Sequence, residues 1–259
     1  METPFKVYVE AGAKRTFAAA LDWPGWSRQG PNEAEALAAM LAYGPKYAGV
    51  LAGTRLGFVA PNDPGQLVVA ERLPGTAATD FGVLSVVATV DRDRSCNPAE
   101  LKRFEKILGA GWNAFDRAVK AARGKTLTTG PRGGGRSVEA IVAHVIGADS
   151  GYLTAVGWKA GKVTSPRGPL AATRGAILLA LEASATGRIP AHGPRGGVRW
   201  TARYFVRRVA WHTIARVGDR AARGARTGPV TLNRDRRPRR TDTGRRAHRQ
   251  SRRHSGANN

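Results

Sequence analysis

The strongest constraint on the fold is a series of helical signals in the second half of the chain, beginning at Asn97. Asn97, Pro98 and Glu100 form the pattern of a capping residue, a proline at the first helical position and an acid three residues after the cap. Apolar residues then recur at steps of three and four, which predicts an amphipathic helix to about Ala122. These positions are Leu101, Phe104, Ile107, Leu108, Trp112, Phe115 and Val119.

Three further segments have the same character. Ser137, Pro169 and Thr201 stand where these helices are expected to begin, and each is followed by apolar residues at helical spacing. Amphipathic helices joined by short or moderate connections pack as a bundle. Residues 97–213 are therefore expected to form a four-helix bundle.

The first half of the chain has a different pattern, so the expected fold class is α+β. Within residues 1–52, segments 6–10 and 15–22 read as the strands of a hairpin, and Asn32 as the cap of a helix. The apolar face of that helix would use Ala36, Leu37, Met40, Leu41 and Tyr43. Residues 53–96 are expected to hold a connector with short strands at 55–59, 66–71 and 84–90, broken apart by proline and glycine.

The charge of the chain is strongly positive but uneven. The formal net charge is +23, from 42 Lys and Arg against 19 Asp and Glu. Residues 214–259 hold 14 arginines and three aspartates, or +11, and the first 213 residues hold the other +12. The tail has no apolar period and is expected to be disordered. Its arginines could contact phosphates without sequence preference, so nucleic acid is expected as a partner only through this tail.

The remaining bulk features favour a cytoplasmic protein that does not enter a membrane. No apolar run approaches the length of about 18 residues that a membrane helix needs, and the chain opens without the pattern of a signal peptide. Cys96 is the sole cysteine, which suits a reducing compartment. Cys96 is either a plain loop residue or a redox nucleophile. Trp23 and Trp26, beside a Pro-Gly turn, either stack on a ligand or staple the hairpin to its helix.

Two histidines are the candidate metal ligands. His144 lies on the second predicted bundle helix in a stripe with Ile141 and Ala148, and His212 follows Val209 on the fourth. Facing helices can bring these imidazoles together, and imidazole is a good ligand for zinc, nickel or iron. The alternative is that each is a hydrogen-bonded core histidine. Asp149, about one turn after His144, is either a further ligand or a solvated residue.

The bundle resembles the DinB-like superfamily. The resemblance rests on residues 137–149, SVEAIVAHVIGAD, and residues 203–213, RYFVRRVAWHT. It implies a divalent metal, zinc or nickel first, held by one histidine of the second helix and an H-x-x-x-H pair of the fourth. His144 and His212 match the first two positions, but Arg216 stands at the third, and a guanidinium cannot ligate a metal. The resemblance further implies a homodimer and a metal- and thiol-dependent transferase, isomerase or hydrolase with a small-molecule or thiol substrate. The site of this chain lacks one ligand of that set.

Residues 1–52 resemble the front half of HicB-like domains. The resemblance rests on the turn Pro24-Gly25-Trp26 and on residues 33–43, EAEALAAMLAY. It implies a β-β-α module. This small module serves many functions, so only the fold is carried over. The competing function is a non-catalytic binding module, for protein or nucleic acid, that uses this front and the basic tail.

The tail also suggests a frameshift. Val217-Gly218-Asp219-Arg220 can be encoded GTG GGA GAT CGA, which read one base later gives Trp-Glu-Ile. DinB-like proteins often have "AWEIED" after the histidines of their fourth helix. Either the frame changes near the codons for residues 211–216 or the basic tail is genuine, and the nucleotide sequence around codons 210–222 distinguishes the two.

Overall fold

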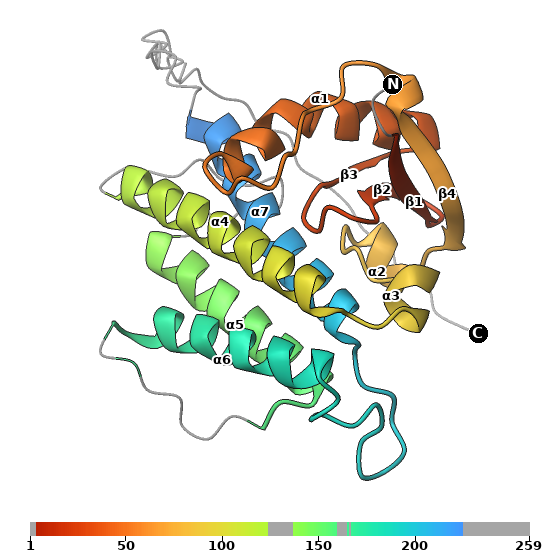
Figure 1. Cartoon of the computed structure of the whole chain (residues 1–259). Helices are drawn as coiled ribbons and strands as arrows, with labels where there is room; N and C mark the ends of the chain where they lie inside the picture. Colours follow the sequence, from red (N-terminus) through yellow and green to blue (C-terminus); the bar gives the residue numbers. More distant parts are fainter. Residues whose placement is uncertain (1–3, 124–136, 160–164, 166, 225–259) are drawn as a thin grey trace, which may run out of the picture. The chain divides into compact units, whose positions relative to one another are not determined.

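The computed structural model describes residues 4–123, 137–159, 165 and 167–224, with side chains as far as Ala215. All of these belong to one unit of the chain, residues 1–226. Their fold is mixed α and β, as expected, with a four-stranded sheet near the N-terminus followed mainly by helices (Figure 1).

The sheet contains the expected hairpin and two further strands. β1 (Phe5–Ala11) pairs antiparallel with β2 (Thr16–Ala20), and β2 pairs antiparallel with β3 (Ser27–Gly30), which was not predicted. β4 (Leu67–Pro74) lies parallel to β1 on its other side, so the strand order is β3-β2-β1-β4. The parallel pair follows from the helix between β3 and β4, which returns the chain to the same end of the sheet.

Only one of the three strands expected in residues 53–96 forms. The run at 66–71 lies in β4, which is preceded by the short 3-10 helix η1 (Pro64–Gln66), whereas 55–59 and 84–88 are irregular. The backbone N–H groups of Ser85 and Val86 donate to the buried Glu10 carboxylate at 3.0–3.1 Å instead of to a neighbouring strand. Thr79 donates to the same carboxylate from the short helix α2 (Ala77–Asp80). Glu10 thereby fixes residues 79–86 against the end of β1.

Alternate residues of the sheet pack on opposite faces. Val7 and Ala18 face α1 (Glu33–Leu51), which is capped by Asn32 as predicted and covers one side of the sheet. Tyr8 and Phe17 face the other side, where residues 84–90 and Trp211 cover them. The sheet is therefore buried on both faces, although no strand among the described residues pairs with the outer edge of β3 or of β4.

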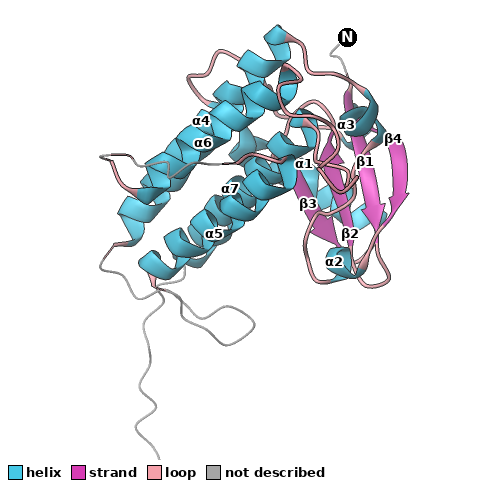
Figure 2. Cartoon of the chain, turned by 90° about the horizontal axis from the view of Figure 1, so that it is seen from below, coloured by secondary structure: helices cyan, strands magenta, loops and turns pink. Residues whose placement is uncertain are grey.

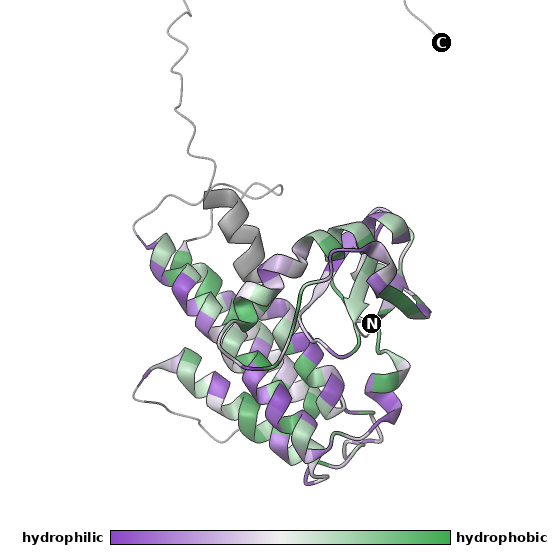
Figure 3. Ribbon diagram, turned by 45° about the horizontal axis from the view of Figure 1, so that its top comes forward, coloured by the Kyte–Doolittle hydropathy of each residue, from purple (hydrophilic) through white to green (hydrophobic). Residues whose placement is uncertain are grey.

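The four predicted bundle helices are present. They are α4 (Pro98–Ala122), α5 (Val138–Val156), α6 (Pro169–Ala185) and α7 (Ala202–Gly224). Asn97 and Ser137 cap α4 and α5 as predicted, and Thr201 accepts from the N–H of Tyr204 at the start of α7. Figures 1 and 2 show these helices side by side, with the sheet flanking α7. In Figure 3, purple hydrophilic and green hydrophobic segments alternate along the helices, as expected of amphipathic helices. None of the helices among the described residues has an apolar stretch long enough to cross a bilayer.

Helix α7 passes the boundary expected at residue 213. Its backbone is helical to Gly224, and Ile214, which belongs to the segment expected to be disordered, is fully buried. Ile214 lies against Gly25 and Gly111, where an added Cβ would meet its side chain. Ile214 thus holds this part of α7 in the core, which the arginine-rich composition of the segment does not indicate. The rest of the predicted tail, residues 225–259, lies outside the described residues.

The hydrophobic core is continuous between the N-terminal module and the bundle. One apolar cluster includes Val7 of β1, Met40 of α1, Phe104 of α4 and Phe205 of α7. Sheet and bundle therefore share their buried surface, and neither is expected to be stable alone.

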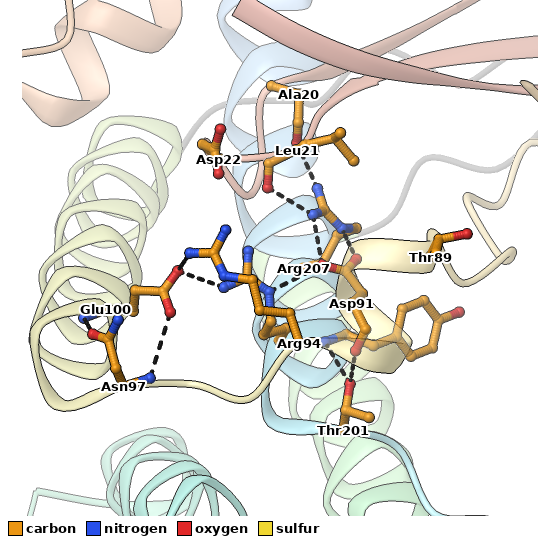
Figure 4. A network of polar contacts seen from close by, with 12 residues as sticks. Ala20, Leu21, Asp22, Thr89, Asp91, Arg94, Asn97, Glu100, Thr201 and Arg207 are labelled. Carbon is orange, nitrogen blue, oxygen red and sulfur yellow. Dashed lines mark hydrogen bonds and ion pairs between the residues drawn. The ribbon is translucent and has the colours of Figure 1, made fainter. Parts of the chain in front are cut away.

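A buried ion cluster joins α7 to the sheet (Figure 4). Asp91, in the short helix α3 (Thr89–Asp93), is 1% exposed. Its two carboxylate oxygens accept hydrogen bonds from Nε and Nη2 of Arg207. Arg207 also donates to the carbonyl oxygens of Ala20 and Leu21 at the end of β2. Arg203 lies 3.7 Å from Asp91 and 2.6 Å from Glu100 of α4. Burial alone would lower the pKa of Arg207, but the Asp91 carboxylate outweighs it and raises that pKa above its ordinary value.

We expect Asp91→Asn to destabilise the fold strongly. The substitution leaves the buried Arg207 guanidinium without a counter-charge, which costs about 3–5 kcal/mol in comparable buried pairs. Denaturant unfolding of the full chain measures the effect. The control is Glu182→Gln, which removes the solvent-exposed pair with Arg188 and is expected to cost less than about 1 kcal/mol. Equal small effects of the two variants would show that Asp91 does not hold α7 in place.

Candidate metal centre

The two predicted metal ligands meet between α5 and α7. The Nε2 atoms of His144 and His212 lie 3.3 Å apart, and the ring centroids lie 5.2 Å apart. His212 is 5% exposed, and His144 is half-buried. The pair therefore lies at the edge of the core, with one member close to solvent.

Each histidine is positioned by its own helix. Ile141 and Val145 on α5, and Val209 on α7, are buried and fix the rotation of the two helices. The ring of Tyr152, two turns after His144, stands perpendicular to the His212 ring with centroids 6.0 Å apart. The sequence correctly identified which residues meet here, because both histidines continue the apolar stripes of their helices.

The distance between the histidine nitrogens fits a shared metal ion. Two imidazole nitrogens bound to one tetrahedral zinc at about 2.0–2.1 Å lie about 3.3–3.4 Å apart, and the observed separation is 3.3 Å. The same distance also fits a hydrogen bond in which one ring donates its proton to the other. The geometry supports a metal but is not unique to one.

A third protein ligand is not found in the described part of the chain. No group of three or more His, Cys, Asp or Glu side chains there could hold a metal. Residue 216, the third position of the resembling family, is on the helical backbone of α7, but its side chain is outside the description. The remaining coordination positions would fall to water or to a bound molecule.

Asp149 does not join the histidines. It lies on the buried stripe of α5 with Val145 and Leu153, five residues from His144 and so on another side of the helix. Asp149 is 0% exposed, and neither of its carboxylate oxygens has a hydrogen-bond partner among the described residues. Burial raises the pKa of Asp149 to about 7, and the charge of Arg174 on α6 only partly opposes this. Asp149 is thus a buried acid inside the bundle, neither a ligand nor a solvated residue.

The other candidate residues of the sequence are structural. Trp26 is fully buried and donates its indole N–H to the carbonyl of Met40, so it staples the sheet to α1. Trp23 lies edge-on to Phe58 and under the guanidinium of Arg103. Cys96 is half-buried, and burial raises the pKa of its thiol, which is the opposite of what activates a nucleophile.

The residues that sequence reasoning missed are the arginines of α7. Arg203, Arg207 and Arg208 are all buried, although adjacent arginines on a helix usually indicate a solvated face. Arg208 lies one turn before His212, and its guanidinium is surrounded by the rings of Tyr152, Trp200 and Trp211 at 5.2–5.5 Å. Aromatic residues flank these arginines in the sequence, and this pattern could have indicated that the arginines are buried.

The chain has no match among known proteins in any of three comparisons: no family model, no curated protein and no solved structure matches it. Any function assigned to the chain therefore depends on the residues of the site.

The buried Asp149 makes stability depend on pH. Because its pKa in the folded chain lies near 7, above the ordinary value of 3.8, folding favours the protonated form. The free energy of unfolding is therefore expected to fall as the pH rises from about 4 to about 7, and to level off above, by about 2–4 kcal/mol from this residue. Asp149→Asn should remove this loss and be the more stable form at high pH, as measured by urea unfolding across the range. Asp93→Asn, at an exposed position, is the control. Parallel pH profiles for the native chain and Asp149→Asn would contradict the assignment.

Proposed function

We propose that residues 97–213 are a DinB-like bundle that binds a divalent metal ion, zinc or nickel, through His144 and His212. The observation that carries the proposal is the 3.3 Å separation of two imidazole nitrogens contributed by different helices. Neutral imidazole suits both metals. The order of the helices and the two histidine positions also fit the resemblance to that family.

The chemistry proposed for the site is that of a metal- and thiol-dependent transferase or hydrolase acting on a small molecule. When bound, such a metal polarises a substrate or lowers the pKa of a coordinated thiol or water. The residues of the chain would hold the ion, and Tyr152 and the apolar wall of α5 would orient His212. With two protein ligands, the site leaves positions open for a substrate, which catalytic metal sites need.

The test is metal stoichiometry of the full chain. We expect about one zinc or nickel ion per chain after dialysis against trace metal, and at least about a tenfold weaker affinity in His144→Ala and in His212→Ala. His192→Ala is the matched control, because His192 is exposed and outside the site. Metal content is measured by elemental analysis, and affinity by competition with a chromophoric chelator.

A gain-of-binding variant sharpens the test. Position 216 is one turn after His212 on α7, where an imidazole can reach the same ion. Arg216→His is therefore expected to raise the affinity for zinc by at least about tenfold, since it adds a third imidazole ligand and removes a positive charge from the chain. A full chain that binds no metal, with or without this substitution, would refute the proposed function.

The second candidate function is a non-catalytic binding module that joins a HicB-like front to a basic tail. The observation that favours it is the +11 charge of residues 214–259. In that case duplex DNA should bind without sequence preference and weaken steeply with salt. Replacing the paired arginines by glutamine at 236, 237, 239, 240, 245, 246, 252 and 253 should abolish that binding and leave the metal content unchanged. Fluorescence anisotropy at two salt concentrations measures the DNA affinity. DNA binding that is unaffected by the replacements would show that the tail is not the DNA-binding segment.

A further inference from the structure

Arg208 is a buried cation without a carboxylate partner. It is 7% exposed, and none of the acids among the described residues forms an ion pair with it. Its neighbours on α7, Arg203 and Arg207, use Asp91 and Glu100. An unpaired buried charge is costly, because the water that it loses is not replaced by an opposite charge.

The hydrogen-bond partners of Arg208 are neutral, and only one of them is close. One terminal nitrogen donates to the carbonyl of Leu84, and the other lies 3.4 Å from the hydroxyl of Tyr152, at the long limit for a hydrogen bond. The Nε–H group is buried and has no acceptor in the part of the chain that the structure describes. Three aromatic rings, of Tyr152, Trp200 and Trp211, surround the guanidinium. Cation–π contacts offset part of the cost of burial, but they leave donors unused.

The position of Arg208 links it to the histidine pair. It precedes His212 by four residues, so both side chains lie on one side of α7. Tyr152 contacts both of them, with its hydroxyl near Arg208 and its ring 6.0 Å from His212. Tyr152, Trp200, Trp211 and His144 are only half-buried, so the cluster lies beside the protein surface.

We propose that Arg208 binds the carboxylate of a small anionic ligand at the histidine site. A carboxylate accepts two parallel hydrogen bonds from a guanidinium and supplies the missing counter-charge. It would displace the weakly bound Tyr152 hydroxyl, and the two tryptophan rings would cover the apolar part of the ligand. This names the substrate class of the proposed metal site and so rests on that proposal for its catalytic meaning. The binding step itself depends on Arg208.

The experiment compares propionate with propionamide, which has nearly the same shape and no charge. Both are titrated into the full chain, zinc-free and zinc-loaded, with tryptophan fluorescence and calorimetry as readouts because Trp200 and Trp211 lie against the guanidinium. We expect propionate to bind at least about tenfold more tightly than propionamide in both forms, since only the anion pairs with the buried cation.

Three variants test the residue. Arg208→Gln should reduce propionate affinity at least about tenfold, and Arg208→Lys should reduce it less, because lysine keeps the charge but not the two-pronged geometry. Tyr152→Phe should raise propionate affinity, because the competing hydroxyl is gone and the ring beside the guanidinium is kept. Arg188→Gln, an exposed arginine outside the site, is the control. Tyr152→Phe and Arg208→Lys keep the test decisive if Arg208→Gln does not fold.

The outcomes separate this inference from the proposed function. Equal binding of propionate and propionamide, or propionate binding that survives in both Arg208 variants, would overturn the inference even where zinc binds with full stoichiometry. Loss of propionate binding in Tyr152→Phe would also overturn it. Anion binding to the zinc-free chain that depends on Arg208, in a protein that takes up no zinc, would support the inference and refute the metal proposal.

Discussion

The Asp91 carboxylate holds two guanidinium groups inside the protein, and the placement of α7 depends on it. Through Arg207 it connects α3 to the end of β2, and through Arg203 it reaches Glu100 at the start of α4. Each of these groups would be costly to bury without the others. The cluster therefore fixes the angle at which the sheet meets the bundle, in addition to the shared apolar core.

Much of the helical part could be predicted from the sequence because its signals are local. Asn97 and Ser137 are capping residues, and a capping residue indicates where a helix begins without reference to distant contacts. The same holds for the hairpin of β1 and β2 and for the cap of α1 at Asn32. The meeting of His144 with His212 was also predictable, because the histidines continue apolar stripes and stripes face each other in a bundle.

The rest depends on contacts between distant residues, which no local pattern reveals. Residues 84–88 have the composition of a strand, but the amide groups of Ser85 and Val86 donate to Glu10, which lies some 75 residues earlier in the chain. Arg203, Arg207 and Arg208 resemble a solvated face until Asp91, Glu100 and the aromatic rings are placed around them. The sequence alone does not distinguish a surface arginine from a buried one, because the cost of burying the charge depends on the groups that surround it in the fold.

Helix α7 carries both the arginines of the ion cluster and one histidine of the candidate metal site. Arg207 and His212 are five residues apart, which turns them to different sides of the helix. One side is tied to the sheet by the buried ion pair, and the other presents His212 to His144. A rigid anchor on one side is what a histidine pair on the other needs, because a metal site tolerates little error in the separation of its ligands. The arginine-rich sequence of α7 is therefore the part of the chain that sets the geometry of the candidate site.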